Sequence, residues 1–166
     1  MAGITRLEPS HRKDYLRSGI NLIQANINNI QINEAKEVIP MIDIQYTIET
    51  EQYGNKTGNR LFIPANIFRK GFTTPDLKQR VQDIHINYGY LDTDSICLQI
   101  PEGYTIESLP KTCQVTSSFG SFSSSLMIKD KEICIIHRLL MHRGIYPKEI
   151  YKDFLEFRKQ IAAQYS

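Results

Sequence analysis

The sequence of 166 residues lacks most of the features that point directly to a function. It has no tryptophan, a net charge of only +2, and no apolar run close to the roughly 20 residues needed to span a bilayer. The small charge, without a basic run interleaved with aromatic residues, argues against nucleic acid or an anionic membrane as a partner. The N-terminal residues lack the apolar core of a signal peptide, so we expect any export signal to lie upstream.

Cysteine is also scarce. Cys97, Cys113 and Cys134 lie at wide spacings without a CxxC motif. Their odd number argues against a disulfide framework, although one pair could still form a bridge. All three fall in strand-like segments, where a small buried thiol is the usual occupant. We therefore expect buried free thiols and leave open whether any two of them pair.

The chain does contain the residue types of a thiol-enzyme triad. Either Cys113 or Cys134 could be combined with His137 and Asp153. However, Cys134 and His137 are three residues apart on one predicted strand, so their side chains point to opposite faces. Neither cysteine begins a helix, where the dipole would favour a thiolate. The pattern disfavours a catalytic triad, and we expect the chain not to be an enzyme.

Metal and cofactor motifs are missing as well. The histidines are scattered, and none lies in a zinc-type pairing with cysteine: His11, His85, His137 and His142. Asp92, Asp94 and Glu102 offer carboxylates, but the DTD stretch lacks the downstream glycine and glutamate of a calcium loop. The glycines near Gly54 lack the spacing and the Lys-Ser/Thr pair of a phosphate-binding loop. We therefore expect no metal and no cofactor.

Tyrosine is numerous in the second half of the chain. Those considered for a sugar- or peptide-binding surface are Tyr88, Tyr90, Tyr104, Tyr146 and Tyr151. β-Sandwich proteins use tyrosine routinely in core and corner positions, and the lack of tryptophan weakens a carbohydrate-binding interpretation. A binding surface of this kind remains an alternative.

Alternating apolar residues predict β-strands through most of the chain. Ile42 to Ile48 alternate cleanly with polar residues, which predicts a strand with one packed and one solvated face. A change of parity at Asn28-Asn29 predicts a bulge or tight turn, and Asp130-Lys131 predicts a hairpin turn. The strand that begins at Glu132 is apolar on both faces, which is typical of a central strand.

The period changes to about 3.6 at the Gly144–Pro147 junction, which predicts one helix over 147–163. Pro147 suits its first position, and a stripe of large apolar side chains should face the sheet. The stripe consists of Ile150, Phe154, Phe157 and Ile161. The fold class is thus mainly β, an antiparallel β-sandwich with a C-terminal amphipathic helix packed on it. Residues 1–19 are predicted to be a polar lead-in with a short helical stretch, from a cap at Ser10 to a stop at Gly19, and 20–166 a single domain.

A resemblance to a known family rests on three stretches: DTDSICLQIPEGYTIESLP, FGSFSSSLMIKDKEICIIHRLL and GIYPKEIYKDFLEFRKQI. They resemble the C-terminal β-domain of a family of uncharacterised exported bacterial proteins. Two earlier stretches fit the same pattern, YLRSGINLIQANINNIQI and GNRLFIPANIF, so the resemblance extends from about Arg12. Members of that family have an N-terminal β-rich domain and a central transglutaminase-like domain. The family's catalytic residues belong to the central domain, so no residue here inherits their roles.

The resemblance implies an exported location, in the periplasm or at the cell surface. It also implies a non-catalytic accessory role beside a transglutaminase-like, peptidase-like domain of the same polypeptide, as structural support or in substrate access. The expected contact residues come from the irregular connection and the helix start: Ile67, Phe68, Phe72, Tyr146 and Tyr151. Two alternatives stay open, a stand-alone glycan- or peptide-binding module and, less favoured, a small thiol enzyme. The ligand is unknown.

Overall fold

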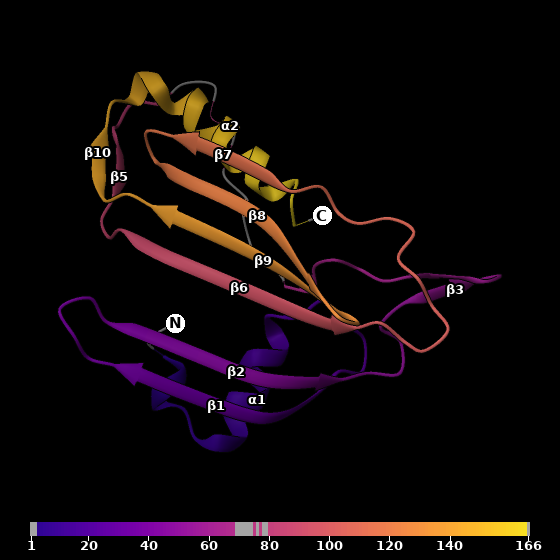
Figure 1. The fold of residues 1–166 in the computed structure, drawn as a ribbon. Helices are drawn as coiled ribbons and strands as arrows, with labels where there is room; N and C mark the ends of the chain where they lie inside the picture. Colours follow the sequence, from indigo (N-terminus) through magenta and orange to yellow (C-terminus); the bar gives the residue numbers. More distant parts are fainter. Residues whose placement is uncertain (1–2, 69–74, 76, 78–79, 166) are drawn as a thin grey trace. The chain divides into compact units, whose positions relative to one another are not determined.

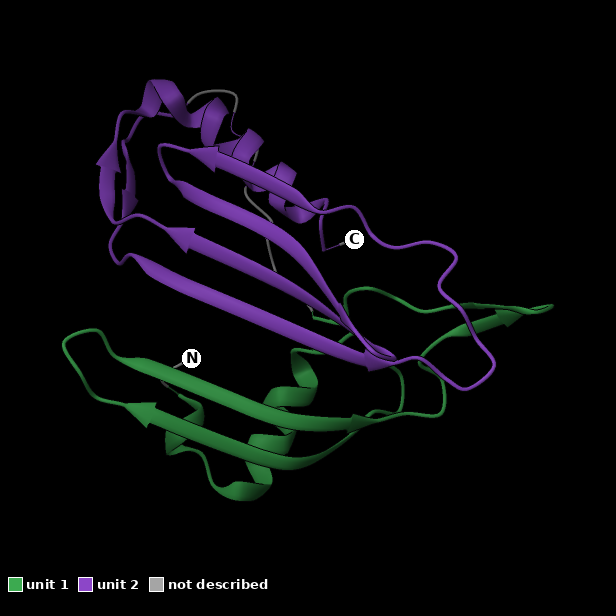
Figure 2. Ribbon diagram, viewed as in Figure 1, with its two compact units in different colours: residues 1–70 green, residues 71–166 purple. Residues whose placement is uncertain are grey.

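The computed structural model describes residues 3–68, 75, 77 and 80–165. The chain forms two compact units, residues 1–70 and residues 71–166 (Figure 2). The sequence suggested a different division, with a lead-in over 1–19 and one domain over 20–166. The N-terminal helix belongs to the first unit because its Leu16 is buried there.

The described residues of the first unit form one α-helix and two β-hairpins (Figure 1). Its elements are η1 (Ile4–Arg6), α1 (Pro9–Ser18), β1 (Asn26–Ala35), β2 (Met41–Glu49), β3 (Asn55–Thr57) and β4 (Arg60–Phe62). β1 pairs antiparallel with β2, and β3 pairs antiparallel with β4. The buried apolar side chains of this unit are Ile4, Leu16, Ile20, Ala25, Ile27 and Ile67.

Three local predictions can be compared directly in this unit. The bulge in β1 is confirmed, because the register with β2 shifts between Asn28 and Gln31 and Asn29 has a positive φ of 53°. The end of α1 at Gly19 is also confirmed. The predicted cap at Ser10 is wrong: the N-cap is Glu8, two residues earlier, and the helix begins at Pro9, whose fixed φ and missing N–H suit a first helical position.

The second unit contains a four-stranded antiparallel sheet and the C-terminal helix. Its elements are β5 (Ile84–Ile86), β6 (Tyr90–Gln99), β7 (Cys113–Ser117), β8 (Gly120–Lys129), β9 (Glu132–Met141), β10 (Gly144–Tyr146), η2 (Lys148–Ile150) and α2 (Tyr151–Ala162). The strand order is β6-β9-β8-β7, and β5 pairs with β10 separately. The mainly antiparallel β class with a C-terminal helix is therefore confirmed. So is the central position of the strand that begins at Glu132.

The core of this unit lies between α2 and one face of the four-stranded sheet (Figure 1). Its buried members are Ile84, Phe119, Phe122, Leu139, Met141, Tyr151, Leu155, Phe157 and Ile161. Two residues of the predicted helical stripe, Phe157 and Ile161, are buried as expected. The other two, Ile150 and Phe154, are half-buried at the margin of the same face. The apolar stripe of such a helix is about 100° wide, so it includes positions next to the predicted ones. Tyr151 and Leu155 are accordingly buried as well.

β8 pairs with β9 along its whole length, and the hairpin turns at Asp130, which has φ of 53°, as the sequence predicted. At the other end of β8, Gly120 allows a close approach to β9. A Cβ atom on Gly120 would lie 1.9 Å from the carbonyl oxygen of Leu140. β8 and β9 can therefore pair along their full length only with glycine at this position. Among the described residues, no helix is long and apolar enough to cross a membrane.

Candidate functional site

The five residues predicted to contact a partner are not brought together by the structure. Ile67 and Phe68 belong to the first unit, and Tyr146 and Tyr151 to the second. Phe72 lies outside the described residues. Two of the five side chains are buried in the chain: Ile67 is 4% exposed and Tyr151 is 6% exposed.

Each of the two buried residues has a structural role. The backbone oxygen of Ile67 accepts a hydrogen bond from the Asn21 N–H at 2.6 Å. The Tyr151 hydroxyl donates to the carbonyl oxygen of Pro75, and the Arg80 guanidinium lies 4.7 Å from the centre of its ring. The sequence pattern could not reveal this, because a tyrosine in the first turn of a helix faces solvent or core depending on how the chain enters the helix.

The two half-buried residues also contribute to packing. Phe68 forms an isolated antiparallel bridge with Ile20 in the first unit. The Tyr146 ring packs 4.7 Å from Phe119, and its hydroxyl donates to the backbone oxygens of Ser118 and His142 at 3.4 Å. A role of these residues in partner binding stays a prediction.

The tyrosines do not gather into one exposed surface either. Tyr88 and Tyr90 are 82% and 46% exposed, whereas Tyr104 and Tyr146 are half-buried and Tyr151 is buried. A sugar-binding surface requires several aromatic rings on one accessible face. Only two of these five tyrosines are exposed, so they support the glycan-binding alternative less than the sequence suggested.

A row of polar side chains crosses the face of the sheet that α2 covers. The cross-strand register places Asp94 of β6 opposite His137 of β9, and His137 opposite Ser124 of β8. Ser124 is in turn opposite Cys113 of β7. His137 and Ser124 are buried, with 5% and 7% exposure. A histidine thus lies between an acid and a hydroxyl, which is the order of residue types in a serine-hydrolase triad.

Aromatic rings cover this row. The His137 ring lies 5.8 Å from Phe122 and 4.8 Å from Tyr165, and the Tyr165 hydroxyl donates to Asp94 Oδ2 at 3.3 Å. Burial, together with the nearby Asp94 carboxylate, raises the pKa of Tyr165 well above its ordinary value of 10.0. Because a nucleophilic serine has to meet its substrate, we interpret the row as a polar network that specifies the packing of the C-terminal segment.

Sequence reasoning missed this row. It combined His137 with Asp153, which is exposed on α2. Alternation does show that Ser124 shares a face with Phe122, and that His137 shares a face with Leu139. It does not show which residue of the neighbouring strand lies opposite, and that register is what brings Asp94 and Ser124 to His137.

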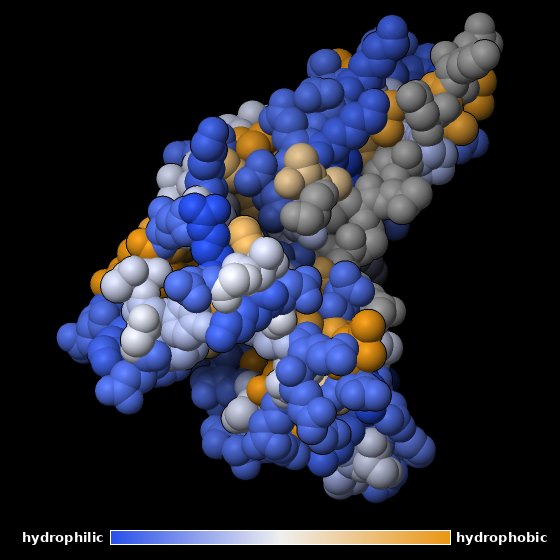
Figure 3. Space-filling view, turned by 90° about the vertical axis from the view of Figure 1, so that its right-hand side faces the viewer, coloured by the Kyte–Doolittle hydropathy of each residue, from blue (hydrophilic) through white to orange (hydrophobic). Residues whose placement is uncertain are grey.

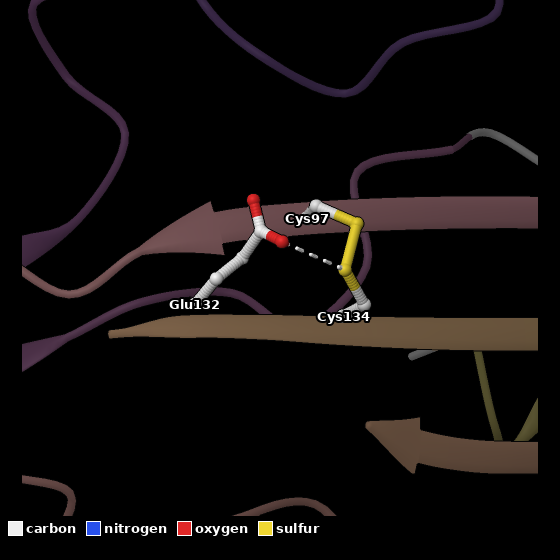
Figure 4. Close-up of side chains that lie close together, drawn as sticks. All are labelled: Cys97, Glu132 and Cys134. Atoms are coloured by element: carbon white, nitrogen blue, oxygen red, sulfur yellow. Dashed lines mark hydrogen bonds between the residues drawn. A yellow bond between two sulfur atoms is a disulfide. The ribbon is translucent and has the colours of Figure 1, made fainter. Parts of the chain in front are cut away.

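Cys97 and Cys134 form a disulfide between β6 and β9 (Figure 4). The expectation of three buried free thiols is therefore wrong for this pair, and Cys113 is the free cysteine of the described chain. The two residues are direct partners in the strand register, where opposite Cβ atoms are close enough for a bridge. Cys97 is exposed and Cys134 is 6% exposed. Glu132 Oε2 lies 3.8 Å from Cys134 Sγ.

The disulfide lies on the face of the sheet opposite to α2, which we call the open face. On this face Leu91 of β6 pairs with Leu140 of β9, and Met127 of β8 pairs with Cys134. Leu91 is 50% exposed, Leu140 38% and Met127 54%. On the side of the molecule seen in Figure 3, taken as a whole, hydrophilic side chains predominate and hydrophobic ones lie in separate patches. Arg138, with Thr93 and Ser123 beside it, lies between the Leu91–Leu140 pair and the Met127–Cys134 pair. The open face thus carries exposed apolar side chains near its two ends, together with a cross-strand disulfide.

These features define the second unit as a helix-covered antiparallel β-domain with a disulfide between its first and central strands. The chain belongs to the family DUF3858, a domain of unknown function with a solved structure, whose match covers residues 59–166. The match includes the whole second unit, together with β4 and the segment that follows it. No curated protein and no solved structure matches the chain significantly.

Proposed function

We propose that this chain is a non-catalytic interaction domain of an exported protein, in which it supports a transglutaminase-like domain or shapes access to that domain's cleft. The observation that carries the proposal is the open face of the four-stranded sheet, where Leu91, Leu140 and Met127 remain substantially exposed. The transglutaminase-like context comes from the sequence resemblance. The exported location is supported by the disulfide, because such bonds persist mainly in oxidising compartments.

The small amount of exposed apolar surface on the open face suggests how such a contact would work. Full burial of a large apolar side chain stabilises by about 1.5–3 kcal/mol, and these three are roughly half exposed. Covering them would contribute about 1 kcal/mol each, or about 3 kcal/mol in total. That is far less than the roughly 8 kcal/mol of a micromolar complex. A covalent link, which gives an effective concentration in the millimolar range, would let so small a surface stay engaged.

The test must detect weak binding. We would titrate isotope-labelled chain with the separately expressed transglutaminase-like domain and follow amide resonances up to millimolar concentration. We expect the chemical-shift changes to cluster on β6, β9 and β8. In Leu140→Lys the affinity should fall by about tenfold or more, because the lysine charge would be buried in the contact. Ile145→Lys is the matched control, since Ile145 is 66% exposed on β10 and away from the open face.

Two results would overturn the proposal. One is the absence of shifts up to millimolar partner, which leaves no contact for a covalent link to strengthen. The other is equal binding by wild type and Leu140→Lys, which would show that the open face takes no part.

A further inference from the structure

We propose that the reduced form of the Cys97–Cys134 pair, together with Glu132, is a binding site for a thiophilic divalent cation, with zinc as the best fit. The disulfide and the metal complex would then be two alternative states of one site. Nothing in this inference depends on the interaction role proposed above.

The strand register builds the ligand set. Cys97 of β6 lies directly opposite Cys134 of β9, so the two sulfur atoms emerge side by side on the open face (Figure 4). Glu132 precedes Cys134 by two residues on the same strand, and the period of two places its carboxylate on the same face. The three ligand atoms lie within 4.8 Å of one another.

The spacing of the atoms suits tetrahedral zinc. With Zn–S bonds of about 2.3 Å and Zn–O bonds of about 2.1 Å, a sulfur and an oxygen ligand lie about 3.6 Å apart. The Cys134 Sγ to Glu132 Oε2 distance is 3.8 Å. A disulfide sulfur carries no hydrogen, so this is a contact in the oxidised state rather than a hydrogen bond. Reduction frees Cys97 Sγ to rotate away from Cys134 and take up a second ligand position.

The donor types favour zinc over the hard cations. Two thiolates and one carboxylate form a soft, strongly anionic set, whereas calcium and magnesium require oxygen ligands. Three protein ligands leave a fourth position for water or another donor. Cys97 and Glu132 are exposed, so the cation can enter from solvent, and Cys134 is held on the central strand of the sheet. The two paired strands also fix the backbone positions of the three ligand residues before the cation binds.

Conversion of the disulfide into the zinc-binding dithiol requires a two-electron reductant, which a second dithiol can supply. Thiol–disulfide exchange breaks the Cys97–Cys134 bond, delivers two electrons and two protons to the pair, and leaves the reductant as its own disulfide. Zinc then displaces the two thiol protons and binds the thiolates. The third cysteine takes no part, because Cys113 is on β7 and opposite Ser124.

The experiment compares zinc uptake by oxidised and reduced protein. The chain is reduced with a phosphine, exchanged into oxygen-free buffer, and titrated with zinc against a chromophoric chelator. We expect about one ion per chain in the reduced form and none in the oxidised form. Cys97→Ser should abolish uptake, and Glu132→Gln should weaken affinity by about tenfold or more. Cobalt in place of zinc should give the sulfur-to-metal absorption and d–d bands of a tetrahedral two-thiolate site.

Cys113→Ser is the matched control and should bind like the wild type after reduction. The inference is overturned if reduced wild type takes up no zinc at roughly micromolar free ion. It is also overturned if Glu132→Gln binds as tightly as wild type, or if Cys113→Ser weakens uptake as much as Cys97→Ser. Half an ion per chain would show a site shared between two copies and would equally refute the single-chain site. Circular dichroism of each variant checks that the fold is retained, and Glu132→Gln keeps the test decisive if Cys97→Ser does not fold.

Discussion

Phe119 is the residue whose removal should destabilise the second unit most clearly. Its side chain is 0% exposed, and it lies in the turn between β7 and β8. Its ring centre lies 4.7 Å from that of Tyr146, 5.0 Å from that of Phe154 and 6.5 Å from that of Phe157. It therefore connects the sheet, β10 and α2 in one aromatic cluster. Phe119→Ala would leave a cavity where these three elements meet.

The expected loss follows from the burial and the cavity. Replacing a fully buried phenylalanine with alanine costs about 3–5 kcal/mol, and edge-to-face partners such as Phe154 add to the packing that is lost. A whole domain is stable by only about 5–15 kcal/mol. For a chain of this size, the melting temperature should fall by roughly 6–20 °C.

Urea unfolding followed by far-UV circular dichroism and tyrosine fluorescence would measure this loss, since the chain has no tryptophan. Ile145→Ala is the control, because Ile145 is 66% exposed and its removal should change stability by about 0.5 kcal/mol or less. A loss below about 1 kcal/mol in Phe119→Ala would refute the reasoning. It would mean that the aromatic cluster does not hold the helix on the sheet.

A close backbone contact and the C-terminal tyrosine should each affect stability in a defined way. Gly120→Ala should lower the free energy of unfolding in urea by at least about 2 kcal/mol, because its Cβ would lie 1.9 Å from the Leu140 oxygen. Gly103→Ala is the control: Gly103 has φ of 82° but open space around it, so this change should cost only about 1–2 kcal/mol. Equal losses in the two variants would contradict the close contact at Gly120. The raised pKa of Tyr165 means that the unfolded chain ionises first, so the free energy of unfolding should fall as pH rises above about 10. Tyr165→Phe should show a shallower fall between about pH 9 and pH 11, and an unchanged slope would contradict the burial of this hydroxyl.

Much of the fold can be predicted from the sequence because the signals are local. Alternation over Ile42–Ile48 predicts a strand, Asp130-Lys131 predicts a hairpin turn, and the parity change at Asn28-Asn29 predicts a bulge; all three are present. Each depends on residues within a few positions of one another. The short strand β10 could not be predicted in this way, because three residues are too few to show a period.

The candidate sites could not be predicted in the same way. Cys97 and Cys134 are 37 residues apart, and counting cysteines did not indicate that they pair. Asp94, His137 and Ser124 come from three strands and meet only because of the order β6-β9-β8. Both features depend on the register between strands, which alternation does not specify beyond the choice of face.

The sequence by itself therefore determined the elements of this protein: its strands, their inward and outward faces, the main turns and the C-terminal helix. These follow from backbone periods and from the local chemistry of glycine, proline and asparagine. The tertiary structure alone decided which side chains meet. It paired the cysteines beside Glu132, buried Tyr151 against Pro75, and left Leu91 and Leu140 exposed on the open face. The physical reason is that strand order and register arise from packing between distant segments, whereas each element arises within its own segment.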